Sequence, residues 1–222
     1  FVAKLDPAGN AVWALRFGDA AIYQEGFDIA SDAQGDVLVT GYFEGTMNFG
    51  GTVLTSAGGT DAFLAKLDPN GNVLWAKRFG GAGAQLGQAL GVDPQGNVVL
   101  LADGFQTMDF GGGALASAGN YDMFVARFDP AGNYLWSKRF GGINADFGQS
   151  LAVDAAGNIV FTGKSDTALD FGSGSPLPAA GGQDALVVKL DPLGAYLWDK
   201  RYGDGANQFG SRVATDLQND VL

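Results

Sequence analysis

A long internal repeat constrains this chain more than any other feature. Four segments with the pattern Asp-Pro-x-Gly followed by a tryptophan recur along the 222 residues, and they begin at Phe1, Phe63, Phe124 and Leu186. Successive tryptophans lie 62, 61 and 62 residues apart, at Trp13, Trp75, Trp136 and Trp198. A period of this length, held to within one residue, predicts a repeat architecture in which each period forms one structural unit.

Each period contains four short runs of β-forming residues separated by turns. In one complete period these runs are 87–93, 97–101, 123–128 and 134–140. Proline and glycine stand in the connecting turns where a fixed φ and a positive φ are needed. No stretch has a sustained apolar period of 3.6 residues, so we predict an all-β chain with essentially no helix.

Four antiparallel strands in about 62 residues have the size of one β-propeller blade. Both faces of the fourth strand carry apolar residues, as a sheet packed between two neighbours requires. We therefore predict a single β-propeller domain, or part of one, over residues 1–222. Its expected parts are a half-blade over 1–18, whole blades over 26–80, 87–141 and 148–203, and a partial half-blade over 210–222.

The two terminal half-blades are complementary, and we expect them to pair and close the ring. A four-bladed ring within one chain is favoured, because an intramolecular partner has the higher effective concentration. An eight-bladed ring from two chains and an excerpt of a larger ring are the alternatives. The absence of an initiator methionine and the break within a strand at Leu222 lead us to expect a piece of a longer protein.

The order of the motifs resembles the bacterial SBBP repeat, the seven-bladed β-propeller repeat. The matching elements are Gly-Asn before the second strand, a stretch like Asp-Phe-Gly-Gly, the run Phe-Leu-Ala-Lys-Leu-Asp-Pro, and Trp-x-Lys-Arg-Phe-Gly. The resemblance covers the whole chain, since these elements recur in order. It implies a propeller and an extracellular or cell-surface location in a bacterium, and it implies no activity.

Composition excludes several kinds of chemistry and of partner. The formal net charge is −11, so binding to a nucleic-acid backbone has no electrostatic basis. No apolar run is long enough for a membrane helix, so no membrane insertion is expected. The chain has no cysteine and no histidine, which excludes disulfides, thiol chemistry, a Ser-His-Asp triad and histidine metal sites. Of the 13 basic residues, only Lys164 and Arg212 lie outside the four repeated segments.

The other repeated residues have structural explanations that we prefer to functional ones. The arginines Arg16, Arg78, Arg139 and Arg201 are expected to pair with an aspartate in each blade, from either of two recurring Asp series. The tryptophans are expected to anchor blade packing, with sugar platforms as the alternative. The Asp68-Pro-Asn-Gly-Asn72 turn has oxygens at alternate positions but lacks the glycine and glutamate of a calcium loop. We therefore expect a hairpin turn there, with no cofactor and no metal.

The longer connections between strands emerge on one face, and we expect this loop face to carry function. The connections from the fourth strand to the next blade differ most. Aligned by the following glycine, each has an amide or an acid at one position, which would ring the mouth of a central channel or cap loop backbone groups. The candidate binding rim is Tyr23, Gln24, Gln85, Asn144, Asp146, Asn207 and Gln208.

From these features we predict a non-enzymatic binding or scaffold module of a bacterial extracellular or surface protein. Its partner would be a protein or a glycan that contacts the loop face. One alternative is a lectin with Tyr23 as its exposed ring, and a second is a hydrolase or lyase that uses acids such as Asp146 and Glu25. Open blade edges also predict self-association. The residues do not identify the ligand.

Overall fold

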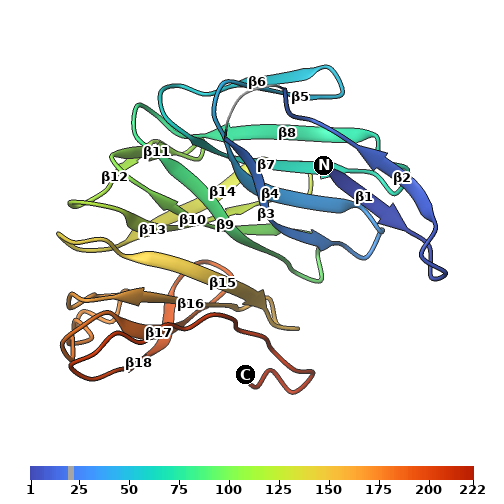
Figure 1. Cartoon of the computed structure of the whole chain (residues 1–222). Helices are drawn as coiled ribbons and strands as arrows, with labels where there is room; N and C mark the ends of the chain where they lie inside the picture. Colours follow the sequence, from blue (N-terminus) through green and yellow to red (C-terminus); the bar gives the residue numbers. More distant parts are fainter. Residues whose placement is uncertain (20–22) are drawn as a thin grey trace.

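The computed structural model describes residues 1–19 and 23–222, and within that part it contains strands and turns only (Figure 1). The prediction of an all-β chain is confirmed there, because no helix is present and every strand pair is antiparallel. It follows that none of these residues forms a helix long and apolar enough to cross a bilayer.

Three four-stranded sheets form the body of the molecule, and we call them the first, second and third units. The first unit has the order β3 (Gln24–Ser31), β4 (Val37–Phe43), β7 (Asp61–Leu67) and β8 (Val73–Phe79). The second has β9 (Gln85–Val92), β10 (Val98–Gly104), β13 (Asp122–Phe128) and β14 (Tyr134–Phe140). The third has β15 (Phe147–Val153), β16 (Ile159–Ser165), β17 (Asp184–Leu190) and β18 (Tyr196–Tyr202).

The sheets pack face to face, with the first strand of each unit beside that of its neighbour. Strand β9 contacts β3 on one side and β15 on the other. Alternate residues of β13 enter different cores: Phe124 and Ala126 pack in the core shared with the first unit, and Met123 and Val125 in the core shared with the third. This explains why the middle strands are apolar on both faces and completely buried.

The connections between the second and third strands were predicted as long loops, but part of each is a hairpin. In the first two units the hairpins are β5 (Thr46–Phe49) with β6 (Thr52–Thr55), and β11 (Thr107–Asp109) with β12 (Ala114–Ala116). In the third unit only the bridge between Leu169 and Leu177 remains. The repeated phenylalanines are buried in the cores between units, and they are Phe49, Phe110 and Phe171. These connections are therefore partly structural.

The two ends of the chain do not close a ring. Strand β1 (Val2–Leu5) pairs only with β2 (Ala11–Leu15), and the segment 210–222 contains one isolated bridge, between Thr215 and Val221. The two termini lie apart in Figure 1. The expected pairing of the terminal half-blades within one chain is therefore wrong for this structure.

The two terminal halves stay apart because of the way in which the units stack. The segment 210–222 packs beside β15, where the Val213 amide donates to Ser150 and the Thr215 hydroxyl donates to the Val153 carbonyl. Each unit is rotated relative to the previous one by an amount that their packing fixes. Three units do not turn the chain through a full circle, so the two halves stay on opposite ends of the stack.

The tryptophans anchor each repeat to the next. The indole N–H of Trp13 donates to the Pro69 carbonyl at 3.0 Å, that of Trp75 to Pro130 at 3.2 Å, and that of Trp136 to Pro192 at 3.1 Å. Each acceptor belongs to the Asp-Pro-x-Gly turn of the following repeat. Directly beside it, the turn glycine lies against the indole ring, and a Cβ on Gly132 would lie 3.1 Å from Trp75. Blade packing therefore uses a tryptophan on one repeat and a turn on the next.

We predict that Gly132→Ala lowers the free energy of unfolding by about 1–3 kcal/mol more than Gly9→Ala, because only the methyl group added at position 132 enters a packed contact. Both glycines have a positive φ, of 81° and 84°, so the backbone strain of alanine is similar at both positions. Gly9 has nothing within 4 Å of the added methyl group. Urea unfolding of both variants measures the difference, and equal losses would contradict the proposed anchor.

Candidate functional site

Two residues of the candidate rim are buried. Gln85 accepts a hydrogen bond from the Gly81 amide at 3.1 Å and donates to the Phe105 carbonyl at 2.9 Å. Asp146 accepts from the Gly142 amide at 2.7 Å. Each side chain accepts from the loop that precedes it and is buried, so neither faces solvent.

The other two members of this aligned series also bond to backbone groups of the loop before them, and Gln24 reaches a neighbouring connection as well. Gln24 accepts from the Asp19 amide and donates to the Thr46 carbonyl. Gln208 accepts from the Asp204 amide and donates to the Asp204 carboxylate. At these four positions the geometry corresponds to the capping of loop backbone groups, which was one of the two interpretations of the sequence.

Three candidate rim residues are exposed, and they lie in different units. Tyr23 precedes β3 and is 53% exposed. Asn144 donates to the Asp166 carboxylate at 3.1 Å beside the third unit, and Asn207 accepts from the Gln183 amide at 2.9 Å near the C-terminal segment. The structure therefore separates the seven candidates into buried or capping residues and scattered exposed ones.

The repeated arginines pair with the second aspartate series. Arg78 lies 2.5 Å from Asp61, Arg139 pairs with Asp122, and Arg201 lies 3.0 Å from Asp184. Arg16 donates instead to the Asp19 carbonyl at 2.9 Å. The three aspartates are fully buried. Removal of the arginine would leave an unpaired buried carboxylate, so these arginines hold the units in shape.

The aspartates at the end of each first strand pair with the basic residue of the third strand. Lys66 lies 2.8 Å from Asp32, Arg127 pairs with Asp93, and Lys189 lies 2.9 Å from Asp154, all in buried surroundings. Burial opposes ionisation of Asp32, but Lys66 and the Asp36 amide outweigh it and hold the pKa of that carboxyl below its usual value. Both aspartate series are thus structural.

In the candidate calcium turn, groups of the turn itself already donate hydrogen bonds to the aspartate carboxylate. Both Asp68 carboxylate oxygens accept hydrogen bonds, from the Asn70 and Asn72 amides at 2.9 and 2.8 Å and from the Asn72 side chain at 2.8 Å. The side-chain bond from Asn72 is the largest contribution to the lowered pKa of Asp68. In residues 1–19 and 23–222, no group of three or more acidic side chains is arranged to hold a metal ion.

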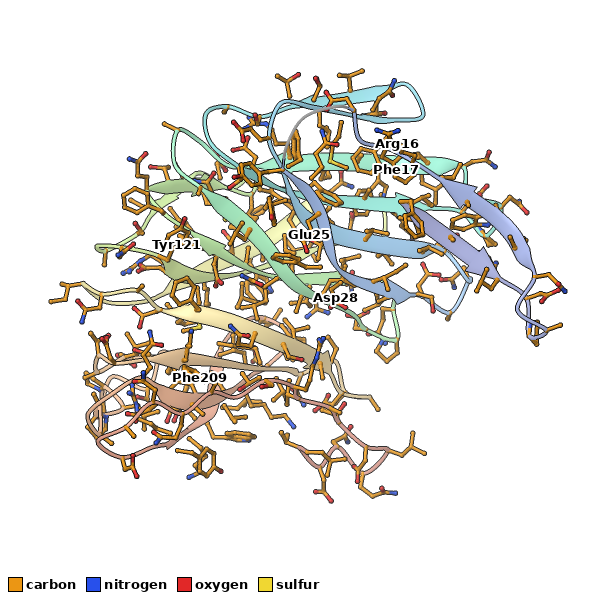
Figure 2. The ribbon with its side chains drawn as sticks, viewed as in Figure 1. Arg16, Phe17, Glu25, Asp28, Tyr121 and Phe209 are labelled. Atoms are coloured by element: carbon orange, nitrogen blue, oxygen red, sulfur yellow. The ribbon has the colours of Figure 1, made fainter. Side chains whose placement is uncertain are left out.

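A cluster on the loop face departs from the repeat, and we call its four residues, Tyr121, Phe147, Lys164 and Phe209, the aromatic–lysine patch. The rings of Tyr121 and Phe147 lie 5.5 Å apart. The Lys164 ammonium lies 5.1 Å from the centre of the Phe147 ring and 4.6 Å from that of Phe209. Figure 2 labels Tyr121 and Phe209, which come from the second unit and the C-terminal segment. Phe209 is 55% exposed and the others are half-buried.

The patch includes one cross-strand position at which the three units differ. The residues directly opposite each other are Glu25 and Tyr42 in the first unit, Leu86 and Asp103 in the second, and Phe147 and Lys164 in the third. In the first unit the Tyr42 hydroxyl donates to Glu25 at 2.9 Å. The first-strand position of this pair thus carries an acid in the first unit, an aliphatic residue in the second and an aromatic ring in the third.

Asp103 is the most perturbed acid near the patch. It is fully buried and accepts from the Gly148 amide of the third unit at 2.8 Å and from Gln88 at 2.7 Å. Burial raises the pKa of Asp103 to about 8, against the effect of these two hydrogen bonds. Burial also raises the pKa of Asp146. Of the two acids named for the hydrolase alternative, Asp146 is buried beside the third unit, whereas Glu25 belongs to the first.

Sequence reasoning did not find the patch, although one signal pointed to it. Lys164 was noted as one of two basic residues outside the repeated segments. Its aligned counterparts are Tyr42 and Asp103, so the position changes its chemistry in every unit. A search for positions where the residue type changes from one repeat to the next would have selected Lys164.

Comparisons with known proteins support the propeller repeat. Residues 135–169 match the family model described as the SBBP beta-propeller repeat, which confirms the resemblance seen in the motifs. An uncharacterised WD repeat-containing protein of Acanthamoeba polyphaga mimivirus is 32% identical over 112 residues, which are 46% of this chain and 8% of that protein. Regulatory protein FlaEY of Caulobacter vibrioides is 29% identical over 167 residues, which are 72% of this chain and 17% of that protein.

A solved structure has a similar fold. It is the crystal structure of a protein of unknown function from Bacteroides caccae, which matches 96% of this chain and 57% of its own chain with a TM-score of 0.54 and 13% identity. At this identity the likeness concerns the fold alone. The chain spans a small part of the length of both curated relatives.

We predict that stability falls as the pH rises from about 4 through about 8, and that Asp103→Asn removes much of this fall. The raised pKa means that the folded state binds a proton which the unfolded state has already released above its lower pKa. The stabilisation is complete below the unfolded pKa and is lost as the pH rises through the folded value. Urea unfolding between pH 5 and 9 measures it. Identical pH profiles for the variant and the parent would show that Asp103 does not cause the effect.

We also predict that calcium is not required for folding, since the turn carboxylates already accept hydrogen bonds from backbone amides. Addition of EDTA should leave the melting temperature unchanged, and subsequent excess calcium should not raise it. A reversible fall of many degrees in EDTA would contradict this prediction.

Proposed function

We propose that this chain is a non-enzymatic binding module that contacts a protein partner through the aromatic–lysine patch on its loop face. The observation that supports this best is that the repeated residues and the patch residues make different kinds of contact. The repeated Trp, Arg and Asp side chains are used in contacts within and between units, whereas the patch departs from the repeat and exposes an aromatic ring.

The position of the patch fits the loop face. Tyr121 directly precedes β13, Phe147 begins β15 and Lys164 is close to the end of β16. In an antiparallel unit the start of the first and third strands and the end of the second lie at the same edge. This edge also carries the connections that differ between units, so residues there vary without loss of the frame.

The chemistry of the patch fits an apolar or aromatic segment that ends in a carboxylate. Aromatic rings provide a large contact area with little loss of side-chain entropy, and they are enriched at the centres of interfaces. Lys164 supplies a cation in a protein with a formal net charge of −11. A carboxylate next to an apolar side chain could contact the ammonium and the rings together.

A carbohydrate-binding function is the alternative, because the exposed Phe209 and Tyr23 rings could also stack on sugars. A hydrolase or lyase that uses acidic loop residues is the second alternative. By resemblance to the SBBP repeat, we propose a location outside a bacterial cell or on its surface. Turnover on a panel of glycosides and esters that disappears in Asp146→Asn or Glu25→Gln would replace the binding proposal with an enzymatic one.

The test compares variants of the patch with a matched control on the opposite face. Peptides selected from a displayed library, and a glycan array, serve as probes for the two kinds of ligand. We expect peptide binding, weakened at least about 10-fold by Phe209→Ala and by Tyr121→Ala. Leu193→Ala, which removes an exposed apolar side chain from a tight turn, should have no effect.

Selective binding on the glycan array, lost in Phe209→Ala or Tyr23→Ala, would favour the lectin. Peptide binding that is equal in all variants would exclude the patch as the binding site.

A further inference from the structure

A second departure from the repeat lies in the first unit, and we call its four residues, Tyr23, Glu25, Phe27 and Tyr42, the aromatic–acid cluster. The centres of the Phe27 and Tyr42 rings lie 5.2 Å apart, and the ring planes are inclined by 72°. The Tyr42 hydroxyl donates to the Glu25 carboxylate at 2.9 Å. Two nearly perpendicular rings therefore stand beside one carboxylate.

The strand register brings Phe27 to the other members of the cluster. In β3, Gly26 pairs with Gly41 and Asp28 pairs with Thr40, so Phe27 is the extra residue of a β-bulge. A bulge interrupts the regular alternation of a strand and re-aims a side chain. As a result, Phe27 meets the Tyr42 ring from the neighbouring strand.

The second unit has the same backbone arrangement with different side chains. Its bulge residue is Gln88, and Gln88 donates to Asp103, the equivalent of Tyr42, at 2.7 Å. The frame thus brings the bulge residue and the second-strand residue together in both units. The first unit uses this meeting point for two aromatic rings, which a packing role for the repeat does not require.

The aromatic–acid cluster is accessible on the loop face. Tyr23 is 53% exposed and Phe27 is 38% exposed, and Glu25 is exposed as well. The second unit is packed beside the same strand, because Asp28 accepts a hydrogen bond from the Leu90 amide at 2.9 Å. The rings are therefore open to solvent with the neighbouring unit in place. Figure 2 labels Glu25 and Asp28 along β3.

The cluster is negatively charged and has no cation of its own. In residues 1–19 and 23–222, neither of the two glutamates of the chain, Glu25 and Glu44, forms a salt bridge. Burial and the hydrogen bond to Glu25 raise the pKa of Tyr42, and the charges of Glu25 and Tyr23 add to this effect. The Tyr42 phenol therefore keeps its proton and its hydrogen bond to the carboxylate.

The third unit shows an ammonium group held at the equivalent place. Lys164 aligns with Tyr42, and its ammonium lies 5.1 Å from the centre of the Phe147 ring and 4.6 Å from that of Phe209. At such distances the face of an aromatic ring attracts a cation. The first unit has rings and a carboxylate at this place but no base, so a cation from outside the chain would make both kinds of contact.

We propose that the aromatic–acid cluster binds an alkylammonium group of a ligand. The Phe27 and Tyr42 rings face the carbon atoms next to the nitrogen, and Glu25 supplies the opposite charge. The formal net charge of −11 attracts cations to the protein before contact is made. This site is separate from the aromatic–lysine patch and goes beyond the proposed function.

The first test compares a cation with a neutral molecule of the same shape, in ligand-observed NMR titrations of the whole chain. The pair is choline and its carbon analogue, in which a tert-butyl group replaces the trimethylammonium group, and butylammonium with butanol forms a second pair. We expect a cation to bind at least about 10-fold more tightly than its neutral analogue, because only the cation gains from the ring faces and the carboxylate. Equal binding within both pairs would overturn the proposal.

The second test assigns the binding to the cluster. Phe27→Leu and Tyr42→Leu each remove a ring, and Glu25→Gln removes the charge, so each should weaken binding of the cation at least about 5-fold. Glu44→Gln is the matched control, because it removes the same charge from the other glutamate, and it should weaken binding less than about 2-fold. Equal losses in the two glutamate variants, or unchanged binding in Phe27→Leu, would exclude the cluster as the site.

A third measurement separates this proposal from the proposed function. Phe27→Leu should bind peptides selected against the parent as tightly as the parent does, because Phe27 lies outside the aromatic–lysine patch. Loss of peptide binding in Phe27→Leu, with its urea unfolding curve unchanged, would show that the cluster is part of the peptide site and would overturn its assignment as a separate cation site.

Discussion

The hydrogen bond from each anchoring tryptophan to the proline carbonyl of the next repeat is the contact on which the arrangement of the units depends. A lone four-stranded sheet with two apolar faces cannot bury both of them, so it needs neighbours on both sides. The hydrophobic effect requires burial but has no direction, whereas the indole N–H and the proline carbonyl fix which face meets which turn. The contact between Trp75 and Gly132 adds a steric limit, because no side chain fits between the ring and the turn. Each repeat therefore has a donor side and an acceptor side, and a stack of repeats is directional.

The buried ion pairs make this frame costly to alter. Asp61, Asp122 and Asp184 are fully buried, and each arginine partner compensates a desolvated carboxylate. Such pairs contribute little net stability, but the loss of the arginine leaves an isolated carboxylate in the interior. The residues that repeat most faithfully are consequently the least available for recognition. Under the proposed binding function, ligand contacts would use positions that these pairs do not constrain, which are the ends of the strands and the connections on the loop face.

The sequence predicted the parts of this fold that follow from period and turn chemistry. The strand 134–140 has the expected bounds, and the Asp-Pro-x-Gly turns and packing tryptophans lie where the repeat places them. The hairpins β5–β6 and β11–β12 were missed, because their strands have only three or four residues, too few for a clear strand pattern. Ring closure was wrong, because the rotation between units is a property of packed faces and is not encoded in the period. The rim residues Gln85 and Asp146 were placed correctly in their loops, but the direction of a side chain in a short loop depends on which backbone amide it can reach.

The aromatic–lysine patch shows how one backbone position can acquire different chemistry within a fixed frame. At the cross-strand pair near the start of the first strand, the second unit turns Asp103 inward, where it holds the Gly148 amide of the next unit. The third unit places Lys164 at the same position, between the Phe147 and Phe209 rings. An acid there strengthens the contact between units, whereas a base beside two rings leaves apolar and cationic surface for a partner. Since the strands on either side are held by the repeated contacts, exchange at this pair alters the surface that the proposed partner would contact, while the pairing of the strands is kept.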